Sequence, residues 1–140
     1  MYYTILRPST VYGEGNKLLE YIKKTAFTRV FPSIKTRTQP IHREDLVEII
    51  SEVVDSHENE TLDIAGKKQL SISEMAKNLY REEGYRCFIL PVPQFLIEGS
   101  LITLSFLPPP FQKENVKILR SSNTTDSNDA EDIIELRDIF

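Results

Sequence analysis

The chain has 140 residues, of which 40% are hydrophobic and 27% are charged, with five glycines and eight prolines. This composition is typical of a soluble globular protein, and the single cysteine, Cys87, excludes an internal disulfide scaffold. A chain of this length can bury about two-thirds of its unfolded surface, so we expect one domain, residues 1–140, with its own core. A lone cysteine favours a reducing compartment, and we expect a cytoplasmic protein.

The net charge of -4 is unevenly distributed along the chain. Residues 1–40 carry seven lysines and arginines against two glutamates, a net of +5, which leaves -9 for residues 41–140. Because no basic block with interleaved aromatic residues occurs, the sequence does not predict a nucleic-acid surface; a solvated helix face or a small anionic ligand are the two interpretations. We expect neither a signal peptide nor a membrane span, since the longest apolar run, residues 95–107, ends at three prolines.

In chain order, residues 2–6 form an apolar run of aromatic and β-branched residues that predicts a strand, buried on both faces of a parallel sheet. A loop over residues 9–16 follows, and helical spacing of apolar residues predicts a helix over 17–27. Residues 39–42 are predicted to be extended. The apolar stripe of residues 43–55 is wide, which predicts a helix that packs against a sheet.

A second strand is expected at residues 61–65, closed by Gly66. Ser71 and Glu74 form a capping box ahead of a helix that ends near Gly84. A third strand is expected at 87–90, helices at 94–106, 111–119 and 130–136, and a loop at 121–129. This order indicates an α/β chain with too few strands for a complete sheet.

Five segments, in the right order, resemble the NAD(P)-dependent epimerase/dehydratase family, also called the extended short-chain dehydrogenases. Residues 5–15, Ile-Leu-Arg-Pro-Ser-Thr-Val-Tyr-Gly-Glu-Gly, are similar to the "LRPxxxYGxG" passage of that family. Residues 39–46 resemble its "QPVHVxDLA", residues 62–66 resemble its "xydlaG" strand, and residues 70–75 and 90–93 resemble the segments that follow. The resemblance implies a partial Rossmann-like fold, with the C-terminal strands and a mostly helical substrate-binding lobe.

The family's catalytic and cofactor motifs have no counterpart in the sequence. No glycine-rich turn follows the first strand, and Gly13 and Gly15 lack a third glycine at the required spacing. The family's tyrosine with a lysine four residues later is also missing, because Lys24 follows Tyr21 by three residues. The resemblance therefore implies the C-terminal half of the fold without its N-terminal dinucleotide-binding half, and no residue is assigned a catalytic role.

The resemblance also implies a nicotinamide cofactor, NAD or NADP, and a set of site residues. The cofactor contacts carried over to this chain are Leu6, Pro8, Ser9 and Thr10. The substrate contacts carried over are Arg7, Tyr12, Arg37 and Gln39. Simpler roles are open for several of these residues: turn hydrogen bonding for Ser9 and Thr10, the end of the strand for Pro8, and core packing for Tyr12. His42 reads as a structural histidine, and the sequence predicts no metal site.

Two functions from different classes follow from the resemblance. In the first, the resemblance implies that the chain would be the substrate-binding lobe of an NAD(P)-dependent epimerase, dehydratase or reductase for a nucleotide-sugar or similar carbonyl compound, inactive without a nucleotide-binding half. Alternatively, it is a non-catalytic protein of the same fold, like the dehydrogenase-like accessory subunit of respiratory complex I. Because its strands would normally join a larger sheet, we expect either a partner chain that supplies the nucleotide-binding half or self-association through the exposed strands.

Overall fold

The structure, a computed structural model, describes residues 3–56, 59–93 and 122–140. The helices expected at 94–106 and 111–119 therefore lie outside the described residues. The chain divides into two compact units. The first unit comprises Met1–Asn16, Arg37–Leu70 and Asn123–Phe140, and the second comprises Lys17–Thr36 and Ser71–Ser122.

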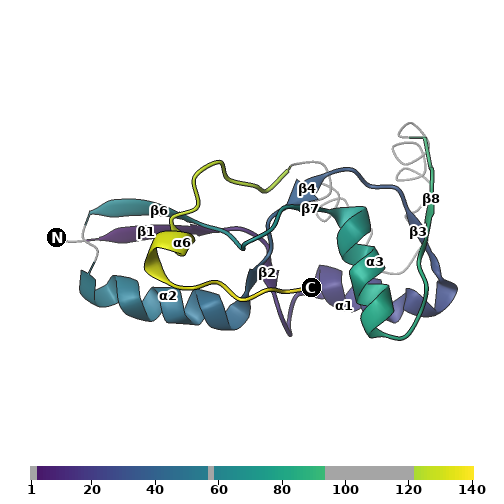
Figure 1. Cartoon of the computed structure of the whole chain (residues 1–140), viewed down its shortest axis with the longest axis horizontal. Helices are drawn as coiled ribbons and strands as arrows, with labels where there is room; N and C mark the ends of the chain where they lie inside the picture. The colour runs from purple at the N-terminus through teal and green to yellow at the C-terminus, as the bar shows by residue number, and fades with distance from the viewer. Residues whose placement is uncertain (1–2, 57–58, 94–121) are drawn as a thin grey trace. The chain divides into compact units, whose positions relative to one another are not determined.

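The first unit is built on a parallel strand pair. Strand β1 (Thr4–Pro8) pairs with β6 (Glu60–Ile64), in a register that sets Leu6 opposite Leu62. Helix α2 (Arg43–Ser56) lies along one face of this pair (Figure 1). A shorter parallel pair joins β2 (Val11–Tyr12) to β5 (Ile41–His42). The predicted strands and the long helix are confirmed, with ends displaced by one or two residues.

Apolar side chains from both strands and from α2 form the core of the first unit. Its buried members are Ile41, Ile49, Val53, Leu62, Ile64, Ala130 and Leu136. The first of the strand predictions is wrong in one respect, since β1 is not buried on both faces: Ile5 remains 48% exposed. In the part of the chain that the structure describes, α2 covers one face of the pair and no element covers the other.

The second unit contains helix α1 (Lys17–Lys24), the 3-10 helix η1 (Ala26–Thr28), and helix α3 (Ile72–Glu82). Strand β3 (Val30–Pro32) pairs in parallel with β8 (Phe88–Leu90). Two-residue strands β4 (Arg37–Thr38) and β7 (Leu70–Ser71) lie where the chain passes between the units. None of the helices described is long and apolar enough to span a bilayer.

Helix ends in the second unit follow local side-chain chemistry. The predicted capping box is present, with the Ser71 hydroxyl accepting from the Glu74 N–H and the Glu74 carboxylate accepting from the Ser71 N–H. Helix α1 is shorter than predicted. The Thr25 hydroxyl donates to main-chain carbonyls of the last turn, and the left-handed φ of +59° at Arg29 ends the 3-10 helix that follows.

The C-terminal segment is anchored by charged groups. Helix α6 (Ala130–Ile133) is shorter than the predicted helix over 130–136, because the chain becomes extended at Ile134. The carboxylate of Asp45, in the first turn of α2, accepts hydrogen bonds from the Arg137 backbone N–H at 2.9 Å and from the Arg137 guanidinium. One residue later, Asp138 forms ion pairs with Lys68 at 3.0 Å and Lys67 at 3.4 Å.

Because of these two lysines, the contribution of Asp138 to the stability of the fold depends on pH. Hydrogen bonds from Lys68 and then Lys67 lower the pKa of Asp138 below its ordinary value of 3.8. A carboxyl with a depressed pKa stabilises the folded state above the unfolded pKa, and this contribution is lost as the pH falls through the folded pKa. We therefore expect Asp138→Asn to lower the melting temperature slightly at neutral pH, by about 1–2 °C for so exposed a pair. The difference between the two proteins should persist down to the ordinary pKa of 3.8 and close only as the pH falls further, through the lower pKa of the folded state; a difference that stays constant at pH values well below this ordinary value would contradict the assignment.

Candidate functional site

The predicted site residues gather at the carboxyl ends of β1 and β6. The Ser9 N–H donates to the Ile64 carbonyl oxygen at 2.8 Å, so the chain after β1 stays beside the end of β6. The Thr10 carbonyl then accepts from the Ile41 N–H at 2.9 Å, which brings β5 to the same edge. In open parallel sheets ligands bind outside the carboxyl ends of the strands, so this edge is the candidate site.

Ser9 and Thr10 use their hydroxyls within the chain. The Ser9 hydroxyl donates to the Asn123 carbonyl oxygen at 2.9 Å. The Thr10 and Thr38 hydroxyl oxygens lie 2.6 Å apart and share a hydrogen bond, and Thr38 is only 2% exposed. Both hydroxyls therefore tie the loop after β1 to segments far away in the sequence, rather than bonding locally within a turn, and their contact with a cofactor remains a prediction.

Gln39 is buried at this edge, and its hydrogen bonds join neighbouring segments of the chain. Its side-chain amide donates to the Gly66 carbonyl at 2.8 Å, and its side-chain oxygen accepts from the Thr125 N–H at 3.2 Å. Its backbone N–H donates to Asn123 and its carbonyl accepts from Gly66, both at 3.1 Å. With every polar group of Gln39 bonded inside the chain, its role in this structure is to join three segments, and contact with a substrate remains a prediction.

Residues 6–8 of β1 divide between the two faces of the strand pair. Leu6 packs, half-buried, on the core. Arg7 projects to the opposite face and makes a two-pronged ion pair with Asp63, its register partner on β6, with Nε at 2.7 Å and Nη2 at 2.8 Å from the carboxylate oxygens. Pro8 is exposed at the end of the strand. Asp63 was not singled out from the sequence, although its place beside Arg7 follows once the two strands are paired in parallel.

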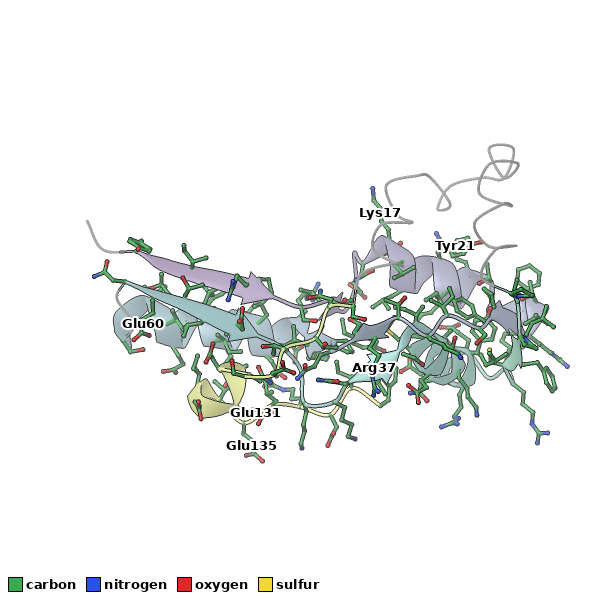
Figure 2. All side chains as sticks on the ribbon, turned by 90° about the horizontal axis from the view of Figure 1, so that it is seen from above. Lys17, Tyr21, Arg37, Glu60, Glu131 and Glu135 are labelled. Carbon is green, nitrogen blue, oxygen red and sulfur yellow. The ribbon has the colours of Figure 1, made fainter. Side chains whose placement is uncertain are left out.

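The Tyr12 side chain contacts other rings of the chain, whereas Arg37 is held through its backbone. The Tyr12 ring packs edge-on against Phe140, with centroids 5.2 Å apart, and lies 6.2 Å from the His42 ring. Arg37 is exposed and is held through its backbone, whose carbonyl accepts from the Asn123 N–H at 2.9 Å; Figure 2 labels its side chain. Two of the eight predicted contacts are cations: Arg7 is held by Asp63, whereas Arg37 is exposed and has no ion pair among the described residues.

The residues at this edge do not complete a dinucleotide site. A diphosphate cradle requires glycines whose missing side chains leave space for the ligand. A side chain at Gly13 would come within 3.2 Å of the Arg43 Cβ, so the space at this glycine is taken by the chain itself. The other glycine of the turn, Gly15, has a left-handed φ of +91°, which accounts for its presence without a ligand. Neither glycine of this turn, as the structure describes it, therefore requires a bound diphosphate to explain it.

Tyr21 has no lysine four residues after it, and its surroundings shift the pKa of its hydroxyl away from neutrality. Burial, and secondarily the charge of Tyr80, raises the pKa of the Tyr21 hydroxyl above its ordinary value. A tyrosine that transfers a proton near neutral pH needs the opposite shift. The side chain, labelled in Figure 2, belongs to helix α1 of the second unit.

Comparisons with known proteins relate the chain to nucleotide-dependent enzymes through structure alone. No protein-family model matches it, and no curated protein has significant sequence similarity to it. The structure of Citrobacter sp. triphenylmethane reductase complexed with NADP(H) matches 99% of this chain and 51% of its own, with a TM-score of 0.73 and 19% identity. A nucleoside-diphosphate-sugar epimerase from Staphylococcus aureus matches 99% of this chain and 50% of its own, with a TM-score of 0.72 and 15% identity.

A third structure, UDP-glucose 4-epimerase from Thermotoga maritima with UDP-glucose, matches 66% of this chain and 33% of its own at a TM-score of 0.55 and 17% identity. The chain thus spans one-third to about one-half of the length of these enzymes. At these identities the likeness establishes the fold. The chain has the partial Rossmann-like α/β fold of NAD(P)-dependent epimerases, dehydratases and reductases, which confirms the family resemblance of its sequence at the level of fold.

Proposed function

We propose that this chain is the substrate-binding lobe of an NAD(P)-dependent epimerase, dehydratase or reductase, and that it acts only together with a nucleotide-binding half. One observation carries the proposal: 99% of the chain matches about half of a reductase whose structure holds NADP(H), while the described residues lack a diphosphate cradle. The ligand is proposed to be a nucleotide-sugar or a similar carbonyl compound. Arg37, with its exposed guanidinium, would bind the anionic part of this ligand.

The proposal predicts that the isolated chain binds neither NAD nor NADP with useful affinity. Isothermal titration of the full chain with each dinucleotide should give no heat of binding at micromolar concentrations, because the sequence has no glycine-rich turn to hold the diphosphate. The Citrobacter reductase, titrated with NADP under the same conditions, serves as the positive control. Micromolar binding by this chain would overturn the proposal.

A second candidate is a non-catalytic protein that kept this fold, as proposed for accessory subunits of respiratory complex I. The observation that favours it is the internal bonding of the site, since Arg7, Thr10 and Gln39 all bond to other residues of the chain. Co-purification of the tagged chain with an inner-membrane complex would favour this candidate. Recovery of the chain from the cytoplasm together with a glycine-rich nucleotide-binding polypeptide would favour the first proposal, which places the protein in the cytoplasm.

A further inference from the structure

The β6 side of the first unit is closed by the C-terminal residues of the chain itself. Along β6, the Asp63 N–H donates to the Asp129 carboxylate at 2.7 Å, and the Ala65 N–H donates to the Asn128 side-chain oxygen at 3.0 Å. Helix α6, which follows these two side chains, packs against β6 and α2 (Figure 1). A further strand or helix could therefore join the unit on this side only by displacing these residues.

The two flanks of helix α2 differ in the same way. Asp45 and Glu48 lie on the flank that faces the C-terminal segment, since both accept hydrogen bonds from Arg137. Three exposed apolar residues share the opposite flank, at the i, i+3 and i+7 spacing of a single helix stripe: Val47, Ile50 and Val54. Because the C-terminal segment lies beside β6, this apolar stripe lies on the β1 side of the unit.

The strand on this side also exposes apolar side chains. Tyr3 is 57% exposed and Ile5 is 48% exposed, on the face of β1 turned away from α2. The one charge of β1, on Arg7, is paired with Asp63. The β1 side therefore carries exposed apolar side chains in both of its layers, strand and helix, and apolar surface gathered in this way marks an interaction site.

We propose that the nucleotide-binding half, as a separate polypeptide, docks on this β1 side and covers both apolar layers. The inference rests on the proposed function and names the surface through which its partner binds. The partner would present apolar side chains to the strand and to the helix stripe together, as a neighbouring strand and helix of an α/β unit do. Removal of these side chains from water would drive the association.

Three observations favour this occupant over a second copy of the chain. The chain covers only 51% of the reductase whose structure holds NADP(H), so that fold needs about as many residues again. Of the two sides of the strand pair, that of β6 is already closed by Asn128 and Asp129, which leaves the side of β1. The loop with the predicted cofactor contacts Ser9 and Thr10 directly follows β1, so a half docked beside β1 would bring a cofactor to this loop.

Photo-crosslinking of the full chain, in the cells that produce it, tests this surface. The photoreactive residue p-benzoylphenylalanine is placed at Val54 in one variant and at Glu135 in a matched control. Val54 is 76% exposed, and Glu135 is an exposed residue of the C-terminal segment on the other side of the unit (Figure 2). We expect an adduct from the Val54 variant alone, whose partner, identified by mass spectrometry, carries a glycine-rich turn between a strand and a helix.

A second measurement uses a charge in place of the crosslinker. Val47→Lys would place an ammonium group in the proposed contact, so the amount of the same polypeptide that co-purifies with the tagged full chain should fall at least about tenfold. Glu135→Lys, the matched control, should leave this amount unchanged. Both substitutions are at exposed side chains, so circular dichroism and thermal unfolding should show that the variants fold like the wild type.

The proposal would be overturned by a second copy of this chain as the crosslinked partner, by a partner without a glycine-rich turn, or by equal adducts at the two positions. A nucleotide-binding polypeptide that co-purifies equally with wild type and Val47→Lys would refute this surface and leave the proposed function standing. If no such polypeptide co-purifies with the wild type, the surface and the separate nucleotide-binding half fail together. Micromolar binding of NAD or NADP by the isolated chain would refute the proposed function first.

Discussion

Replacement of Gly66 by alanine is expected to be the most destabilising methyl addition at any of the four glycines that the structure describes. A Cβ built at Gly66 would lie 1.7 Å from the Pro40 carbonyl oxygen and 2.6 Å from the Pro40 carbonyl carbon. Both are backbone atoms, so no side-chain rotation can relieve the overlap. The segments must separate, which breaks the hydrogen bonds between Gly66 and Gln39. We expect a loss of about 3 kcal/mol or more in the free energy of unfolding.

Urea unfolding followed by circular dichroism measures this loss. Gly15→Ala is the control, because a Cβ there meets nothing within 4 Å and the substitution tests only the left-handed φ of +91°. That strain alone should cost about 1–2 kcal/mol. If Gly66→Ala proved no more destabilising than Gly15→Ala, the close approach of the two segments at Pro40 and Gly66 would be refuted.

The elements that the sequence predicts well are those with local signals. The capping box at Ser71 and Glu74 needs only a four-residue pattern, and it forms as predicted at the start of α3. Helix α2 and the strands β1 and β6 carry runs of apolar residues whose spacing fixes the element type. The apolar run of β1 predicted a place in a parallel sheet, and β1 does pair in parallel with β6, although it is not buried on both faces as that pattern implied.

The bonds that hold the candidate site together were not predictable in the same way. Residues 121–129 were expected to form a polar loop, yet their Asn128 and Asp129 side chains bond the outer edge of β6 and Thr125 bonds Gln39. Each of these contacts joins residues more than sixty positions apart. An asparagine in a polar loop has the same local pattern whether or not it meets a strand, so only the folded chain distinguishes the two cases.

Asp45 illustrates the same difference at a single residue. Its place in the first turn of α2 predicts a favourable interaction with the helix dipole. In the structure it is 1% exposed and also accepts hydrogen bonds from the Arg137 backbone N–H and guanidinium, ninety-two residues away. The same carboxylate thus stabilises a helix end and fastens the C-terminal segment to it.

Asp45→Ala is accordingly expected to release the segment that follows α6. The substitution leaves the Arg137 N–H without its acceptor and removes a buried carboxylate, which should cost about 2–3 kcal/mol in the free energy of unfolding. Urea unfolding gives the overall loss. Hydrogen exchange of the Arg137 amide, which should become fast in the variant, locates the loss at this contact.

Glu48→Ala is the matched control, because Glu48 contacts the same guanidinium at 3.3 Å from a side chain that is 50% exposed. A half-exposed contact of this kind should contribute no more than about 0.5 kcal/mol. The two variants should differ because Asp45 accepts a hydrogen bond from the Arg137 backbone N–H, whereas Glu48 contacts only the guanidinium. Equal losses in the two variants, or a slow Arg137 amide in Asp45→Ala, would show that the guanidinium alone, and not the buried bond to the main chain, holds the C-terminal segment to α2.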